Sequence, residues 1–322
     1  MSIITEKYQN AFELSSEDIG SRLDQAISNH CQGISRSKLQ AWIKAGSVTV
    51  DGKIETKPKA KMLGTESIEV SAELEQAGEW EAQNIPLDVV FEDDNLLIVN
   101  KPAGLVVHPA VGNRNGTLVN ALLYRAPELI KLPRAGIVHR LDKDTSGLLV
   151  VAKNLESHNS LVAQLQERAF EREYQCVVHG QMVAGGSAEQ PIGRHPTNRI
   201  QMAVVPNGKE ALTHFRLIEK FNHFTHLKVN LETGRTHQIR VHMAYLKYPL
   251  VGDPLYGKKN FAPSGSSEEL RDALRHFKRQ ALHARKLGLI HPTTNEFMSW
   301  EQSAPDDYLA LVDTLKKYDP LS

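Results

Sequence analysis

The chain has 322 residues, of which 38 are Lys or Arg and 38 are Asp or Glu, so its formal net charge at neutral pH is zero. This balance excludes an overall attraction to nucleic acid, and any such binding must come from a local basic patch. Hydrophobic residues make up 41% and charged residues 24%, which excludes a disordered or fibrous chain and leaves room for about two domains.

The first part of the chain predicts an arm followed by a small basic domain. Residues 1–19 are polar, end in a turn signal and are interpreted as an N-terminal arm. Residues 20–75 predict two short helices, a hairpin that turns at Asp51 and Gly52, a basic loop and a closing strand. A basic helix is more often a solvated face than a binding surface, so its charge alone does not decide a function.

A polar, acidic stretch over residues 76–86 predicts a linker, and a larger domain follows over residues 87–322. Residues 180–208 of that domain are rich in Gly and Pro and predict turns. Apolar patterns predict strands over residues 87–92, 96–100, 148–151, 173–178, 215–218, 225–231, 281–289 and 297–300. Helical spacing predicts helices over residues 118–123, 155–168, 236–246, 269–277 and 308–315.

The stretch GIVHRLDKDTSGLLVVAK, residues 136–153, predicts a polar turn between two short apolar strands. This turn fixes Asp142 at the rim of a sheet, with His139 and Arg140 just before it. Catalytic side chains concentrate on loops that a rigid scaffold holds, so Asp142 is a candidate nucleophile or acid/base. An aspartate in a turn more often bonds only its own backbone, and that alternative stays open from the residues alone.

Two other enzymatic interpretations use the same turn. LDKDT resembles the DxDx[TV] nucleophile motif of Mg²⁺-dependent aspartate phosphatases, although Ser146 stands in its last position. Asp142 and Asp144 could form a glycosidase pair, because alternate residues of a strand lie about 6.5 to 7 Å apart on one face. The turn residues that follow disfavour such strand geometry. His237 and His242 are five residues apart with no carboxylate to complete a ligand set, so no metal site is predicted.

Several motifs together resemble a known family. HRLDKDTSG, VNKPAGLVVHP, REYQCVVHG and LETGRTHQIRVHMA are similar to the motifs of RluA-type pseudouridine synthases, and RLDQAI, SRSKLQAWIKAGSVTVDGK and GTESIEV are similar to the S4 RNA-binding module. The resemblance covers residues 20–305. It implies an α+β fold with a small N-terminal S4 (α-L) domain. It also implies a larger catalytic domain built on a mixed, mainly antiparallel sheet with flanking helices.

The resemblance also implies site residues. In that family the Asp of HRLD is the catalytic nucleophile, which implies this role for Asp142. Tyr174 matches an aromatic residue whose hydroxyl sits over the target base, and Arg240 matches a basic residue that pairs with the nucleophile. A nearby cation favours the ionised form of a carboxylate, as a nucleophile requires. The helix that carries Arg240 is expected to begin with Thr236 as its N-cap.

Three further residues are predicted to bind substrate. The resemblance implies that Arg140 holds the space left by the extruded base or binds flanking phosphates. Ile239, the neighbour of Arg240, is assigned to the same pocket. His139 follows two apolar residues, so substrate contact and a satisfied near-core position are equally favoured readings of it.

The implied reaction converts uridine to pseudouridine without gain or loss of atoms, so neither a cofactor nor a metal is expected. The expected substrate is 23S rRNA, in the helix 69 stem-loop, or a large ribosomal subunit precursor, with the target base taken out of its stack. The expected RNA contacts of the S4 domain are Arg36, Lys38, Lys53, Lys57 and Lys59. The non-enzymatic alternative is an S4-containing assembly factor whose larger domain only binds RNA.

The two cysteines, Cys31 and Cys176, lie far apart in sequence and predict neither a disulfide framework nor a cysteine-based metal site. Charged residues occur early in the chain without an apolar run of signal length, and no apolar run anywhere approaches the roughly 18 residues that span a bilayer. The sequence therefore predicts a cytoplasmic chain that is neither secreted nor inserted into a membrane, and we expect it to be a monomer.

Overall fold

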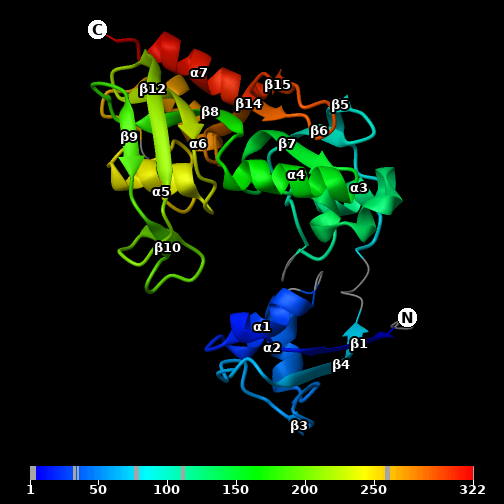
Figure 1. Ribbon diagram of the computed structural model, residues 1–322. Coiled ribbons are helices and arrows are strands. Elements are labelled where there is room, and N and C mark those ends of the chain that lie inside the picture. The colour runs from blue at the N-terminus through cyan, green and yellow to red at the C-terminus, as the bar shows by residue number, and fades with distance from the viewer. Residues whose placement is uncertain are drawn as a thin grey trace. The chain divides into compact units, whose positions relative to one another are not determined.

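The computed structural model describes residues 5–31, 34, 36–75, 80–109, 113–257 and 262–321, and Figure 1 shows its elements. The chain forms two compact units, residues 1–80 and 81–322. Residues 76–79 of the predicted linker lie outside the described residues. Among the described helices, none has the length and apolar character needed to cross a bilayer.

The N-terminal unit packs two helices on one antiparallel sheet, in which the strand order is β1-β4-β2-β3. Its elements are β1 (Thr5–Glu13), η1 (Ser16–Asp18), α1 (Leu23–His30), α2 (Arg36–Lys44), β2 (Val48–Val50), β3 (Lys53–Ile54) and β4 (Ser67–Glu75). Leu23, Ile27, Leu39 and Ile43 come from the apolar faces of both helices and are fully buried in its core. The predicted helix, helix and hairpin order is confirmed, as expected of an S4 domain.

The predicted N-terminal arm is corrected for its described part. Strand β1 pairs with β4 along its whole length, from Thr5 opposite Glu75 to Glu13 opposite Ser67. This edge strand reads as polar because one of its faces is exposed, while Tyr8 and Phe12 alternate onto the core on the other. The period of two was present in the sequence, but its partner strand lies too far along the chain for a local pattern to find.

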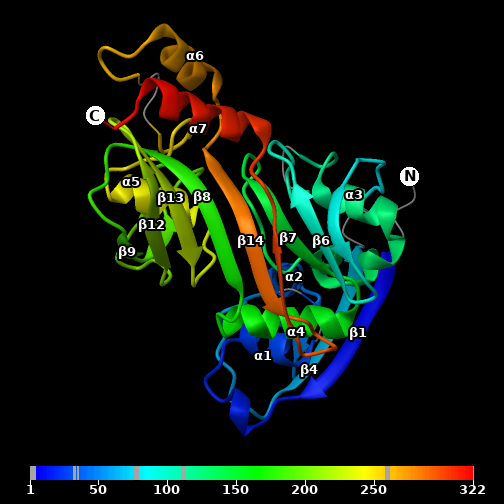
Figure 2. The same cartoon turned by 90° about the horizontal axis from the view of Figure 1, so that it is seen from above.

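The larger unit is built on a nine-stranded sheet in the order β5-β6-β7-β14-β8-β13-β12-β9, with β15 paired to β14. Figure 2 shows its central strands side by side. All neighbours are antiparallel except β7 and β14, which confirms the mixed, mainly antiparallel sheet. Its strands are β5 (Asp88–Glu92), β6 (Leu96–Lys101), β7 (Ser146–Ala152), β8 (Glu171–His179), β9 (Gly186–Glu189), β12 (Leu212–Lys220), β13 (Phe224–Leu231), β14 (Leu282–Ile290) and β15 (Phe297–Glu301).

The helices of this unit flank the sheet. They are α3 (Leu118–Arg125), η2 (Pro127–Lys131), η3 (Pro133–Gly136), α4 (Leu155–Gln166), α5 (Gln238–Tyr245), α6 (Glu268–His276) and α7 (Asp306–Tyr318). Leu161 of α4 packs with Ile98 and Val150 of the sheet, and α7 buries Tyr308 and Leu315 in a second apolar cluster. Because β7 is buried over its whole length, it reads as a continuous apolar run rather than an alternating one.

The turn-rich segment over residues 180–208 also contains short strands that the sequence did not predict. Besides β9, these are β10 (Ile192–Arg194) and β11 (Met202–Val204), which pair with each other as a separate hairpin. Figure 1 shows this hairpin extending beyond α5. Three residues per strand carry too little periodicity for a sequence pattern to separate them from turns.

Candidate active site

The polar turn before β7 positions Asp142. The Thr145 N–H donates to the Asp142 carbonyl at 3.1 Å, which closes the turn. The strand predicted on its N-terminal side reduces to an isolated bridge between Ile137 and Val151, because the 3₁₀ helix η3 ends at Gly136. The buried strand on the other side is β7, as predicted. Asp142 therefore stands on a short loop whose C-terminal end is fixed in the centre of the sheet.

Lys101, at the end of β6, ties this turn to the neighbouring KPAG turn. Only 1% of Lys101 is exposed, and its ammonium donates to the carbonyls of Pro102, Leu105 and Lys143 at 2.8, 3.0 and 2.9 Å. Burial lowers the pKa of Lys101 to about 7. Three carbonyl acceptors need three N–H donors, so the ammonium form is the one that restrains the backbone of the turn.

The turn is also held from the side of β14. The Ser146 hydroxyl and the His283 Nδ1 are 3.0 Å apart, and the Gln280 side-chain amide donates to the Thr145 hydroxyl at 3.0 Å. The Arg279 Nη1 donates to the Asp144 carbonyl at 3.3 Å. The loop that carries Asp142 is thus restrained by two separate strands of the same sheet.

Arg240 of α5 binds Asp142. Its Nη1 donates to the Asp142 Oδ2 at 2.9 Å, and its side chain is only 4% exposed. Burial by itself would lower the pKa of Arg240, but the hydrogen bonds and charges of Asp253 and Asp142 raise it above the ordinary arginine value. The predicted contact between a helix arginine and the HRLD aspartate is therefore present.

Asp253, which the sequence did not single out, holds Arg240 in place. The Arg240 Nε and Nη2 donate to the two Asp253 carboxylate oxygens at 2.7 and 2.8 Å. Oδ1 of Asp253 also accepts the Leu255 and Tyr256 backbone N–H groups at 2.9 and 3.1 Å, and its side chain is fully buried. Asp253 stands in the stretch PLVGDPLYG, residues 249–257, and only the fold shows that it faces Arg240.

His237 lies on the other side of Asp142. Its Nε2 is 3.9 Å from the Asp142 Oδ1, and its Nδ1 is 2.8 Å from the Tyr256 hydroxyl. Burial lowers the pKa of His237, so the neutral imidazole is favoured. The Met202 N–H donates to the Tyr256 oxygen at 2.8 Å, so this phenol connects His237 with β11.

His237 also replaces the predicted helix cap. The sequence predicted Thr236 as the N-cap of α5, whereas His237 occupies this position with a left-handed φ of 58° and makes no capping hydrogen bond with its side chain. A turn in this conformation directs the imidazole toward Asp142 instead of the helix N–H groups. The cap prediction is therefore wrong.

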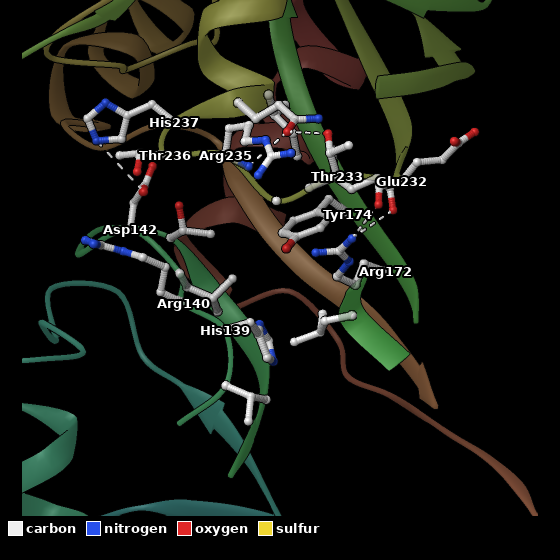
Figure 3. Close-up of a pocket in the computed structure, with 18 of the residues that line it drawn as sticks. His139, Arg140, Asp142, Arg172, Tyr174, Glu232, Thr233, Arg235, Thr236 and His237 are labelled. Carbon is white, nitrogen blue, oxygen red and sulfur yellow. Dashed lines mark hydrogen bonds and ion pairs between the residues drawn. The ribbon is translucent and has the colours of Figure 1, made fainter. Parts of the chain in front are cut away.

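Tyr174 lies on β8 across the cleft from Asp142, as Figure 3 shows. The residue is 7% exposed. Burial raises the pKa of its hydroxyl, and the charge of Asp142 adds to that effect while the charge of Arg172 opposes it. The phenol is accordingly protonated at neutral pH and presents a neutral aromatic surface to the cleft.

The predicted substrate residues surround a cleft of about 810 Å³, which is lined by Asp142, Tyr174 and Arg240 among others. Arg140 is exposed and Ile239 is buried, and both line this cleft. His139 lines it too, but its Nε2 accepts the Val150 N–H at 3.2 Å and burial lowers its pKa to about 3. This geometry fits the near-core reading of His139, and its substrate contact stays a prediction.

The five residues of the N-terminal unit that are predicted to contact RNA differ in whether their charged groups contact other side chains or are exposed. Arg36 is bonded to the buried Asp24, with its Nε 3.1 Å from the carboxylate, and the Lys38 Nζ lies 5.9 Å from the ring centre of Trp42. The remaining three are exposed, and these are Lys53, Lys57 and Lys59. Contact with RNA stays a prediction for all five.

The geometry of the turn removes one alternative use of its carboxylates. Asp142 to Thr145 form a hydrogen-bonded turn, so Asp142 and Asp144 do not lie on one face of a strand as a glycosidase pair was assumed to do. Within the residues that the structure describes, no three His, Cys, Asp or Glu side chains are grouped as metal ligands.

Known proteins share these features. The RNA pseudouridylate synthase family matches residues 95–245, and the S4 domain family matches residues 21–63. A Vibrio vulnificus protein named ribosomal large subunit pseudouridine synthase D is 52% identical over 93% of this chain and 92% of its own length. An Escherichia coli protein of the same name is 49% identical over 97% of this chain and 96% of its own length.

The solved structure of human RNA pseudouridylate synthase domain containing 1 is also similar, with a TM-score of 0.55 and 26% identity over 75% of this chain and 91% of that one. An S4 unit joined to a catalytic unit of this fold defines an RNA-modifying isomerase as the class of protein. The chain belongs to the RluA family of pseudouridine synthases, in the form that carries an S4 domain. The resemblance stated from the motifs is thereby confirmed, and membership of this family sets the phosphatase reading aside.

Proposed function

We propose that this enzyme converts specific uridines of 23S rRNA to pseudouridine, in the helix 69 stem-loop, with Asp142 as its nucleophile. The single observation that carries the mechanism is the 2.9 Å bond between the Arg240 Nη1 and the Asp142 Oδ2 at a cleft of about 810 Å³. The choice of RNA is supported by relatives about half identical to this chain whose name refers to the large ribosomal subunit. It acts as a monomer in the cytoplasm, on 23S rRNA or on a subunit precursor.

The reaction conserves all atoms. The C1′–N1 bond of uridine breaks, a C1′–C5 bond forms after the detached uracil turns, and one proton leaves C5 while one joins N1. Asp142 supplies the nucleophile for the sugar or base, and Arg240 keeps it ionised when the substrate excludes water. A target base in a loop costs only a few kcal/mol to extrude, which favours a stem-loop over a continuous duplex.

The environment of Tyr174 favours stacking on the target base over transfer of a proton. Its buried ring forms a wall of the cleft, and a base can stack on such a face. Because the pKa of its hydroxyl is raised, the phenolate needed to accept the C5 proton is scarce at neutral pH. If Tyr174 removes the C5 proton in the last step of the reaction, the substrate complex must first favour the phenolate.

The test is to incubate the purified full chain with an RNA copy of the helix 69 stem-loop and to map pseudouridine by selective chemical labelling. Product at defined uridines is expected, and none with Asp142→Ala at equal RNA affinity. An assembly factor without activity would bind the stem-loop and form no product with either protein. Restoration of the missing pseudouridines in 23S rRNA from a deletion strain is the corresponding result in cells.

A further inference from the structure

Arg172 is a buried cation in the cleft whose charge no carboxylate matches. It precedes Tyr174 by two residues on β8, so the two side chains lie on the same face of the strand, as Figure 3 shows. Arg172 is 7% exposed and lines the cleft. Its Nη2 donates to the carbonyl of Glu232 at 3.0 Å and to that of Leu231 at 3.4 Å, whereas its buried Nε has no hydrogen-bond partner.

Other buried arginines of this unit are paired. Arg240 binds two carboxylates and Arg279 binds Asp307 through two hydrogen bonds. Over the described part of the chain, no carboxylate lies within 4.0 Å of the Arg172 guanidinium. A buried guanidinium without a counterion is costly, and an anion that arrives from outside would offset part of that cost.

Gly234 provides the space for this guanidinium. A Cβ atom on Gly234 would lie 2.7 Å from the Arg172 Nη1, closer than a carbon and a nitrogen can approach. The φ angle of Gly234 is not in the left-handed region, so the backbone there does not itself require glycine. A side chain at this position would make the flexible end of Arg172 shift.

The neighbouring charges reinforce the positive character of this part of the cleft. Arg235 is half-buried, lines the same cleft and donates its Nε to the carbonyl of Glu210 at 2.8 Å. The nearby Glu232 carboxylate is already bound by His214 at 2.6 Å and by Arg168 at 3.5 Å. The unmatched positive charge thus belongs to Arg172 and Arg235.

We propose that Arg172, with Arg235 beside it, forms a subsite for a backbone phosphate next to the extruded nucleotide. The inference rests on the proposed function and deepens it, because it names where the RNA backbone is held relative to Tyr174. The Nη1 is the proposed donor, and a phosphate oxygen supplies the charge that a neutral uracil carbonyl lacks. Arg172 acts as a positioning residue rather than as a catalytic one.

The test is the salt dependence of RNA binding by full-length Arg172→Gln, measured with a fluorescent helix 69 stem-loop. Each phosphate contact contributes roughly 0.7 to 0.9 to the slope of log affinity against log salt. We expect the slope to fall by about that amount, and KM to rise about tenfold with kcat changed less than about threefold. Arg172→Lys keeps the charge and should retain the slope.

Arg168→Gln is the matched control, because Arg168 lines the same cleft but is already paired with Glu210 and Glu232. Its slope should equal that of the wild type. If Arg172→Gln does not fold, Arg235→Gln decides the question, because it removes the second charge of the proposed subsite.

Three outcomes distinguish the ideas under test. An unchanged slope and KM in folded Arg172→Gln, or in Arg235→Gln where Arg172→Gln does not fold, overturns the phosphate subsite. A raised KM with an unchanged slope also overturns it, because the contact would then be to the uncharged base. Absence of product from the wild type, with the salt effect present, overturns the proposed function and leaves the subsite standing.

Discussion

Each unit of this protein contains an aspartate bound by arginine, Asp24 in the N-terminal unit and Asp142 in the catalytic unit. The two aspartates differ in how many hydrogen bonds they accept and in how exposed they are. In the N-terminal unit, Asp24 accepts hydrogen bonds from Arg22 at 2.9 Å and from Arg36 at 3.1 and 3.2 Å, and it is also bound by Gln40. Its side chain is fully buried. All of its capacity goes to joining α1 and α2, which makes it a structural residue.

In the catalytic unit, two aspartates share the binding of one arginine, Arg240. Asp253 is the fully buried one and takes two hydrogen bonds from Arg240, as Asp24 does from each of its arginines. Asp142 takes only one bond from Arg240, and 16% of its side chain is exposed. The comparison teaches that Asp142, the proposed nucleophile, has its charge stabilised by a group that another carboxylate already holds in place.

The largest effect should come from Asp142→Asn. The amide can still accept a hydrogen bond from Arg240 but cannot act as a nucleophile, so product formation should fall by at least about 10³-fold. The free energy of unfolding should change by no more than about 1 kcal/mol. Single-turnover product assays and urea unfolding measure the two quantities, and turnover within tenfold of the wild type would refute the assignment.

Asp253→Asn should lower stability more and activity less than Asp142→Asn does. It leaves the buried Arg240 with one weaker partner, and breaking a buried ion pair costs about 3 to 5 kcal/mol. Stability should therefore fall far more than in Asp142→Asn, while kcat falls roughly tenfold to a hundredfold because Arg240 loses its orientation. Equal stability of the two variants in urea unfolding would break the comparison between a structural and a reactive carboxylate.

Asp24→Asn should destabilise the N-terminal unit by about 2 kcal/mol. Burial alone would raise the pKa of Asp24, but hydrogen bonds from Arg36, Gln40 and Arg22 lower it from 3.8 to about 2, a difference worth about 2 kcal/mol. Product formation on a minimal stem-loop should persist, since Asp24 has no part in the chemistry. Urea unfolding followed by tryptophan fluorescence, with Trp80 and Trp300 replaced by Phe so that Trp42 alone emits, reports on this unit.

The pH dependence of that stability has a defined sign. The pKa of Asp24 is lower in the folded chain than in the unfolded one, so its stabilising effect is fully present above about pH 4 and is lost as the pH falls through about 2. The difference in unfolding free energy between wild type and Asp24→Asn should shrink over that window. A constant difference down to pH 2 would show that the hydrogen bonds of Asp24 do not depend on its charge.

Local patterns predicted most of the fold but few of these pairings. The predicted helix over residues 118–123 is α3, where Thr117 accepts from the Asn120 N–H as an N-cap, and the buried run of β7 was visible in the sequence. The pairing of β1 with β4 was not, because about sixty residues separate them. The arm was therefore predicted where the structure has a strand.

The site could be predicted only where a motif carried it. Asp142, Tyr174 and Arg240 stand in dense motifs, and the structure brings them to one cleft. Lys101 and Asp253 act through backbone carbonyls and a buried guanidinium, contacts that depend on how distant strands and loops meet. No spacing rule links such residues to their partners, and the left-handed turn at His237 overrode the local capping preference for Thr236.

The smallest effect should come from the exposed lysines of the N-terminal unit, and it sharpens the contrast with Asp24 and Arg36. Lys57 and Lys59 are exposed, so replacing both by Gln should leave the free energy of unfolding unchanged. If each binds one phosphate, the slope of log affinity against log salt should fall by roughly 1.4 to 1.8 in total.

Lys7→Gln is the control, because it removes an exposed charge from β1 of the same unit and should leave the slope as it is. Arg36→Gln should instead lower stability, since that arginine is bonded to Asp24. A salt slope that falls as much in Lys7→Gln as in the double variant would show a diffuse attraction rather than contacts by the basic loop.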